Sequence, residues 1–376
     1  MQNTDDPNAV ATDLWRQIFL REAEKPFSTI IPPDYDPAVD EARMLHGFLN
    51  AGWLPSEVDK LLDNCRVAFA GAPVTSPGVA AHIELRHEHL CTLVENAMRA
   101  LGIETYARTT RGIEPRLGVS AGKIGVIMTD QSIVTVSAFF FRFCGLIAKA
   151  YVRSLRLNPY LWESTNYNIE QGAALIGSGP DIIDYWIRIY LAFAIHGSNY
   201  GVPFLPCRRD ELHLVEMVAE SMELFAIAHE YGHHHLAHGR NVDEDPWHQE
   251  YEADQFALRV CAEACRSNNG LENPYLRSGA GGAILLRALE ILRTVERRLG
   301  APGESDDTHP QVCDRIRRFD SVEAMRPREF VRLRSFRLAG DRIFLSAATM
   351  IDDFIAGLAP DDISAFYRFR RSMHES

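Results

Sequence analysis

The sequence lacks the features of an exported or disulfide-stabilised protein. Its seven cysteines include no Cys-x-x-Cys pair, and such an odd, unpaired set is typical of thiols kept reduced in a cytosol. The N-terminal stretch MQNTDDPNAVATD has neither the basic region nor the apolar region of a secretory signal. These absences predict a cytoplasmic protein.

An excess of basic residues is also missing. The formal net charge is -12, and no block of Lys and Arg resembles a nucleic-acid footprint. The small basic clusters, Arg208 with Arg209 and Arg315 with Arg317 and Arg318, are interpreted as solvated helix faces or ends. We therefore expect no nucleic-acid partner and no electrostatic binding to anionic lipid.

No apolar run is long enough to predict a membrane span. The stretch IVTVSAFFFRFCGLIAKAY contains Arg142 and Lys149, and WIRIYLAFAIHGSNYGVPFL contains Arg188 and His196 before it breaks at Gly and Pro. Neither reaches about 18 uninterrupted apolar residues. Both stretches are predicted to be core segments, and no membrane insertion is expected.

The patterning that is present predicts an α+β fold that is mostly helical. Apolar periodicity indicates helices through residues 1–110. From about Gly112 the character changes, and RLGVSAGKIGVIMTDQSIVTVSAFFF predicts two strands around a turn at residues 129–131. Helical patterns then continue to the end of the chain. The sheet is therefore expected to be small, with helices on both sides of it in the sequence.

The strongest chemical signal is FAIAHEYGHHHLAHGR at residues 225–240, which holds five histidines. His229, Glu230 and His233 form the pattern His-Glu-x-x-His. On a helix the two histidines lie about 40° apart and one turn apart, so that both imidazoles can reach one cation. Glu230 lies beside them, where it can take a proton from a metal-bound water. Because the preceding MELFAIA predicts a buried helix, where an unpaired polar group costs about 1–3 kcal/mol, metal binding is favoured over an accidental pattern.

The other histidines of this stretch do not share that face. Measured from His229, His234 lies about 140° round the helix, His238 about 180° and His235 about 240°. A metal cluster of five histidines is therefore not expected.

A catalytic zinc ion is usually held by three protein ligands and a water, so one more ligand is needed. In DEDPWHQEYEADQFAL, Asp245 can cap a helix and Pro246 can occupy its first turn. Glu250 and Asp254 then lie one turn apart on one face. We predict Glu250 as the third ligand, and Asp254 as an acceptor for the second ring nitrogen of a ligating histidine.

Two neighbours compete with Glu250 for this role. Glu252 points about 200° away from it on the same helix and is a poor competitor. His248 is the stronger rival in ligand chemistry, but its choice would leave Glu250 and Asp254 without a role.

These motifs resemble those of a known family. HEYGH followed by EYEAD is similar to the gluzincin metallopeptidases, in particular the group that contains the HtpX-type membrane protease and the CAAX prenyl protease. DDTHPQVCDRIRRF, residues 306–319, is similar to that group's Ser/Thr-His-Pro segment followed by an Arg-Ile helix. The resemblance covers residues 211–320.

The resemblance implies a role for each matching residue. The implied zinc ligands are His229, His233 and Glu250, with Glu230 as general base and Asp254 behind the ligands. His309 matches the histidine of the third element, where it could stabilise the oxyanion of the reaction or visit the metal in a resting state. A structural histidine at a helix start is the alternative for His309.

The resemblance implies an activity, and together with the helical and strand patterning of the rest of the chain it predicts a domain organisation. A zincin-like metallopeptidase domain is expected at residues 111–322, after a helical region of unknown role at 1–110 and before C-terminal helices at 323–376 that pack on it. The implied activity is zinc-dependent hydrolysis of peptide bonds in a soluble protein or peptide substrate. The lack of spanning helices departs from the membrane-bound relatives.

Two alternatives to a constitutive protease stay open. The same residues would suit a structural or regulatory zinc module in a binding protein, with little or no turnover. They would also suit a latent protease, activated by a partner that moves the loop at 267–282 or displaces His309.

Overall fold

The computed structural model describes residues 46–60, 81–103, 109–114, 117–125, 132–158, 161, 167–239, 245–267, 272–300, 309–321 and 327–359. Short helical segments at 46–50 and 55–60 come first. The elements that follow are α4 (Ala81–Ala100), β1 (Thr109–Glu114), β2 (Ala121–Gly125), β3 (Ser132–Ser137), α5 (Ala138–Leu157), α6 (Ile169–Gly177), α7 (Pro180–His196), α8 (Leu212–His235), α9 (Pro246–Ser267), α10 (Pro274–Ser278), α11 (Ala280–Arg298), α12 (Val312–Arg318), η3 (Phe319–Ser321) and α13 (Pro327–Ala356). The α+β, mostly helical fold is confirmed.

The sheet has three strands in the order β1-β3-β2. β3 lies in the middle, antiparallel to β2 and parallel to β1, and all six of its residues are buried. The two predicted strands correspond to β2 and β3, and the predicted turn at 129–131 lies outside the described residues. β1 was not predicted, because its sequence TTRGIE is short and polar, with little of the alternation that marks a strand.

The second predicted strand ends earlier than expected, at Ser137. The run of three phenylalanines that follows belongs to the first turn of α5. Aromatic residues favour strands in general, but the buried residues of this segment recur at helical spacing. The buried side chains of α5 include Phe140, Cys144, Ile147 and Tyr151. The stripe that these residues form along one face of α5 explains why the helix replaces the end of the strand.

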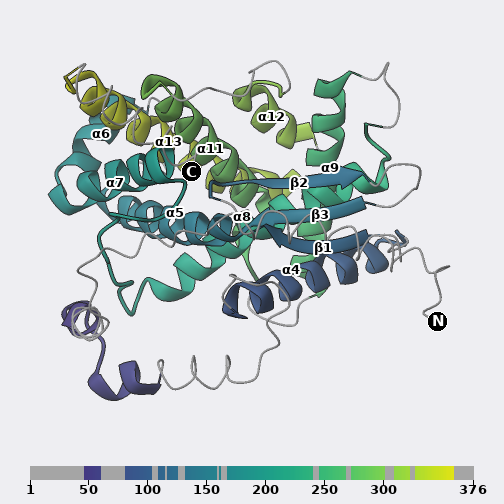
Figure 1. The fold of residues 1–376 in the computed structure, drawn as a ribbon, viewed down its shortest axis with the longest axis horizontal. Helices are drawn as coiled ribbons and strands as arrows, with labels where there is room; N and C mark the ends of the chain where they lie inside the picture. The colour runs from purple at the N-terminus through teal and green to yellow at the C-terminus, as the bar shows by residue number, and fades with distance from the viewer. Residues whose placement is uncertain are drawn as a thin grey trace, which may run out of the picture.

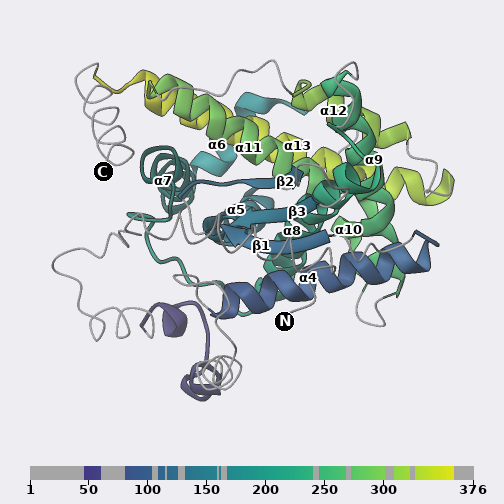
Figure 2. The same cartoon turned by 45° about the vertical axis from the view of Figure 1, so that its right-hand side comes forward.

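α8 is the central helix of the structure. All of its residues from Ser221 to Gly232 are buried, and it packs against α4, α5, α9 and α11 as well as strands β2 and β3. Figures 1 and 2 show α8 behind the sheet, with other helices around it. The close approach of α11 depends on Gly281, because a Cβ at that position would lie 2.3 Å from the Cβ of Ser221.

α4 is the first long helix of the described chain, and it packs against this core. It packs against α8 and α9, and Arg86 on α4 forms an ion pair of 2.7 Å with the buried Glu223 on α8. On the sheet side, Arg111 of β1 pairs with Glu88 and Glu95 of α4. These contacts hold α4 against the helix that carries the His-Glu-x-x-His pattern, while the predicted domain division at residue 110 stays a prediction.

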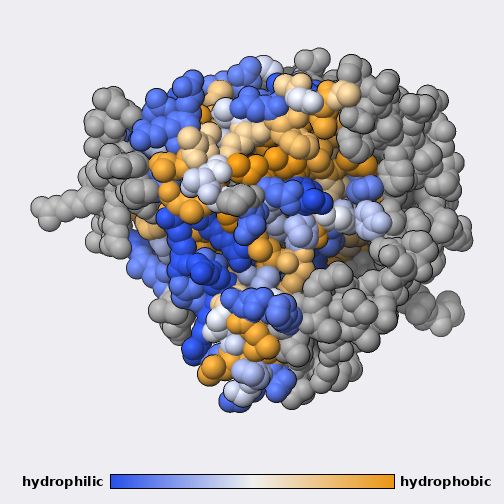
Figure 3. Space-filling view, turned by 90° about the vertical axis from the view of Figure 1, so that its left-hand side faces the viewer, coloured by the Kyte–Doolittle hydropathy of each residue, from blue (hydrophilic) through white to orange (hydrophobic). Residues whose placement is uncertain are grey.

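The C-terminal helix α13 packs on α6, α10 and α11. Within the described ranges, no helix combines the length and the apolar character that crossing a bilayer requires. Figure 3 shows apolar side chains gathered on the face that lies at the left of Figure 1, where α6, α7 and the end of α13 are found. Ile169 at the start of α6 and Phe354 near the end of α13 are exposed.

Candidate metal centre

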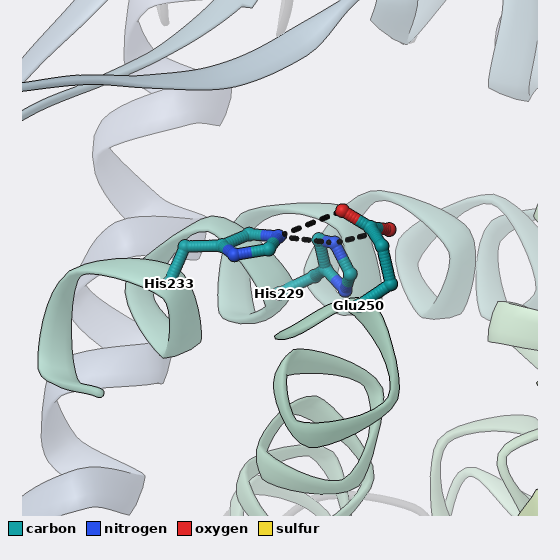
Figure 4. A group of neighbouring side chains, drawn as sticks. All are labelled: His229, His233 and Glu250. Atoms are coloured by element: carbon teal, nitrogen blue, oxygen red, sulfur yellow. Dashed lines mark hydrogen bonds and ion pairs between the residues drawn. The ribbon is translucent and has the colours of Figure 1, made fainter. Parts of the chain in front are cut away.

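Three predicted ligand side chains converge where α8 and α9 cross. The Nε2 atoms of His229 and His233 are 2.9 Å apart. The carboxylate of Glu250 approaches both rings, with Oε2 at 3.5 Å from Nε2 of His229 and Oε1 at 3.3 Å from Nε2 of His233. Figure 4 shows the two rings and the carboxylate turned towards a common point. Among the described residues, these three form the only group of this kind that could hold a metal ion.

The spacing of the donor atoms suits a tetrahedral cation. A zinc ion with bonds of about 2.0–2.1 Å to each donor would set neighbouring donors about 3.3 Å apart. The two Nε2 atoms are 2.9 Å apart, and a different oxygen of Glu250 approaches each of them, at 3.3 and 3.5 Å, so these separations are close to that value. Two imidazole nitrogens and one carboxylate oxygen are also a common catalytic donor set for zinc. The residues present therefore fit the ion that the sequence predicts.

The local sequence explains how α9 delivers Glu250. Pro246 is the first residue of α9, and the side chain of Asp245 accepts a hydrogen bond of 3.0 Å from the backbone N–H of Trp247. The predicted start of this helix is thereby confirmed. Glu250 is one turn further on and is buried, and α9 packs closely along α8.

Asp254 lies beside His229, on the side of the ring away from His233 and Glu250. Its Oδ1 is 3.1 Å from Nδ1 of His229, and its side chain is 4% exposed. A carboxylate at this distance favours the tautomer of His229 that keeps a proton on Nδ1 and a lone pair on Nε2. In that tautomer, Nε2 of His229 is the nitrogen available to a cation.

Arg315 is a site residue that the sequence interpretation missed. It was assigned to a solvated helix face, which is wrong: Arg315 is 6% exposed. Its Nε and Nη2 donate to the two oxygens of Asp254 at 2.8 and 2.7 Å, and its Nη1 lies 3.1 Å from Oε2 of Glu250. The resemblance of residues 306–319 to the third motif, with its Arg-Ile helix, could have indicated that Arg315 belongs to the site. Its charge, next to two more arginines, instead favoured a position on the surface.

Glu230 is buried beside the ligands, at 9% exposed. Burial raises the pKa of its carboxyl to about 7, and the charge of Glu250 acts in the same direction. A carboxyl group with a pKa near neutrality can both accept and release a proton at physiological pH.

His309 approaches the same centre from the segment that leads into α12. Its Nε2 lies 3.8 Å from Oε1 of Glu250, and its side chain is 38% exposed. Two residues of the third motif, His309 and Arg315, therefore lie close to Glu250, although they follow it in the sequence by about sixty residues.

Of the other three histidines, predicted to point away from the face of His229 and His233, only two do so. His234 is buried and lies 2.8 Å from the Oγ of Ser132 on β3, and His235 packs against Phe256. His238 departs from the prediction, because its Nδ1 lies 2.9 Å from Nδ1 of His233. The helical angle did not apply to it, since α8 ends at His235. His238 faces the far nitrogen of the His233 ring, so it is outside the group of ligand atoms.

The two rivals of Glu250 also find other partners. Glu252 lies 3.2 Å from Nε2 of His238 and 3.5 Å from Nε2 of His248. The side chain of His248 is 66% exposed. Glu250 is therefore the residue of α9 that the fold turns to the two histidines of α8.

The electrostatics of the site favour a cation between these side chains. Burial disfavours the charged imidazole, but the carboxylates of Asp254 and Glu250 outweigh burial and raise the pKa of His229 to about 10. Burial likewise opposes ionisation of Glu250, yet the hydrogen-bonding rings of His229 and His233 hold its pKa well below the usual range. At neutral pH these carboxylates therefore favour a proton on His229, and a cation bound between the three side chains would take the place of that proton.

Comparison with known proteins adds one finding. Residues 208–332 match the family model described as Peptidase U49. The match supports a peptidase. It includes His229, Glu230, His233, Glu250 and Arg315 in one segment, whereas the finer resemblance to the HtpX and CAAX prenyl protease group stays a prediction. No curated protein and no solved structure matches the chain.

Proposed function

We propose that the protein is a zinc-dependent endopeptidase that hydrolyses peptide bonds in a protein or peptide substrate. The observation that carries this proposal is the convergence of two imidazole nitrogens and one carboxylate within 2.9–3.5 Å of one another. The Peptidase U49 match across the same segment favours a peptidase over other zinc-dependent hydrolases. The resemblance of the motifs to the gluzincins agrees with this choice.

His229, His233 and Glu250 would hold the ion. Bound there, zinc would supply an activated water and polarise the carbonyl group of the scissile bond. The chain would contribute the rest. Asp254 orients His229, and Arg315 balances the charges of Asp254 and Glu250, which would otherwise be two carboxylates confined together in a buried place.

Glu230 is the proposed general base. It would take a proton from the attacking water and deliver it to the leaving amine as the peptide bond breaks. Its burial and its position between the two ligand histidines in the sequence suit that role. His309 would stabilise the oxyanion, since its half-buried ring lies at the edge of the site, with Nε2 at 3.8 Å from Oε1 of Glu250.

An extended substrate would bind along β2. This strand lies at the edge of the described sheet and packs against α8, the ligand helix. An edge strand offers backbone N–H and C=O groups to an added strand, and such pairing gives affinity with little dependence on the substrate's sequence. With a net charge of -12, the protein is expected to act on polypeptides and not on nucleic acid.

The test compares wild type with Glu230→Gln, which keeps the size of the side chain and removes the base. We expect about one zinc per chain in both proteins by elemental analysis, and cleavage of an unfolded protein by wild type alone. A His229→Ala variant should contain little zinc and serves as the metal-free reference.

Equal cleavage by wild type and Glu230→Gln would contradict the catalytic assignment. Stoichiometric zinc without cleavage in either protein would instead favour the regulatory zinc module or the latent protease. Wild-type protein that binds no zinc would refute the proposal as a whole.

A further inference from the structure

His238 occupies an unusual position just after the end of α8. The backbone N–H groups of Leu236, Ala237 and His238 donate to the carbonyl groups of Gly232, His234 and His233, at 2.9, 3.1 and 3.0 Å. Ala237 adopts a left-handed backbone conformation with φ of 58°, and it is the one residue other than glycine that does so in the described chain. That conformation costs roughly 1–2 kcal/mol for a residue with a side chain. A left-handed residue with these hydrogen bonds is a common way for a helix to end, and here it turns the chain so that His238 faces back towards α8.

The turn brings His238 back under the ligand helix. Its side chain is 4% exposed, and its Nδ1 lies 2.9 Å from Nδ1 of His233. On the other side of the ring, Nε2 lies 3.2 Å from Oε2 of Glu252 on α9. The backbone carbonyl of the same residue accepts a hydrogen bond of 2.7 Å from Nζ of Lys123 on β2. His238 is therefore held by groups from α8, α9 and β2 at once.

These contacts permit one arrangement of protons if His233 is a ligand. Its Nε2 then carries a lone pair for the cation, so its proton is on Nδ1. Nδ1 of His238 must accept that proton's hydrogen bond, which leaves the proton of the His238 ring on Nε2. Nε2 then donates to the carboxylate of Glu252, which is an acceptor when ionised.

We propose that His238, supported by Glu252, is a positioning residue that fixes the tautomer and ring orientation of His233 for metal binding. This inference rests on the proposed function and adds a partner for the second histidine ligand. Asp254 serves the first ligand, His229, directly. The second ligand, His233, instead contacts the imidazole of His238, which in turn contacts the carboxylate of Glu252.

The experiment measures zinc affinity by competition with a chromophoric chelator. The variants are His238→Ala, which removes the acceptor, and His238→Gln, whose amide can accept from His233 and donate to Glu252. The matched control is His213→Gln, an exposed histidine near the start of the same helix. Loss of a hydrogen-bond partner behind a metal ligand typically weakens binding about 10–100-fold. We expect that loss in His238→Ala, partial recovery in His238→Gln and no change in His213→Gln.

A second measurement is independent of activity and of the affinity. Long-range ¹H–¹⁵N correlation spectra of the imidazole rings should show His233 of zinc-loaded wild type with its proton on Nδ1, protected from exchange with water. In zinc-loaded His238→Gln the tautomer should persist, and in His238→Ala the protection should be lost.

The outcomes separate this inference from the proposed function. If wild type and His213→Gln bind zinc, and folded His238→Ala binds it within threefold of wild type, the positioning role is refuted while the metal site stands. A proton on Nε2 of His233 in the zinc-loaded protein would also refute it. If wild type binds no zinc, both proposals fail together.

Discussion

Replacing Arg315 by Met tests whether the charges behind the ligands are as interdependent as the geometry indicates. Methionine keeps much of the side-chain volume but removes the guanidinium that contacts Asp254 at 2.7 and 2.8 Å and Glu250 at 3.1 Å. Because the side chain is 7% exposed, water cannot replace these contacts. Removing one partner of a buried ion pair destabilises a protein by about 3–5 kcal/mol. We expect that loss in the free energy of unfolding of the metal-free protein.

The control and the metal dependence make this prediction specific. Arg317→Met removes an arginine whose side chain is 75% exposed and which pairs with Asp314 on its own helix, so its loss should be about 0–1 kcal/mol. Urea titrations in the presence of a chelator compare the two variants. Repeated with excess zinc, the titrations should show a smaller loss for Arg315→Met, because the cation neutralises the same carboxylates. A metal-free Arg315→Met protein within about 1 kcal/mol of Arg317→Met would refute the reasoning.

Two further predictions concern packing and metal removal. Gly281→Ala should lower the free energy of unfolding by about 1–3 kcal/mol, because its Cβ would lie 2.3 Å from the Cβ of Ser221. Gly145→Ala, in a helical position with nothing within 4 Å of the added Cβ, should raise it by about 0.5–1 kcal/mol; equal effects in the two urea titrations would contradict the packing argument. Zinc at about 1,000 times its dissociation constant should stabilise wild type by about 4 kcal/mol in thermal melts. The same addition should leave His229→Ala unchanged, and an equal shift in both would place the ion elsewhere.

The ligand pattern was predictable because it depends on local geometry. Two histidines one turn apart, and a carboxylate in the first turns of the next helix, are fixed in their helices by the spacing of the sequence. The helix start at Pro246 was likewise indicated by local capping chemistry. What the spacing alone did not determine was that α8 and α9 cross where these side chains meet, and here the resemblance to a known family carried the prediction.

The features that the sequence did not predict depend on contacts between segments that are far apart in the chain. The sequence around Arg315 predicts a surface residue, because its partner Asp254 is sixty-one positions away in the chain. His238 was assigned a direction by extending the helix beyond its end, whereas the left-handed residue Ala237 reverses the chain there. β1 has too few apolar residues to be recognised alone and is defined by its pairing with β3.

The separation of sixty-one positions between Asp254 and Arg315 also has a consequence for synthesis. The ribosome adds about 5–20 residues per second, so the carboxylates of α9 emerge several seconds before the guanidinium that neutralises them. Until then, burying Asp254 and Glu250 together would be opposed by their desolvation and mutual repulsion. We therefore expect Asp254 and Glu250 to be buried together late, after α12 has left the ribosome, so that a growing chain would not carry the completed candidate centre beside its own unfolded segments.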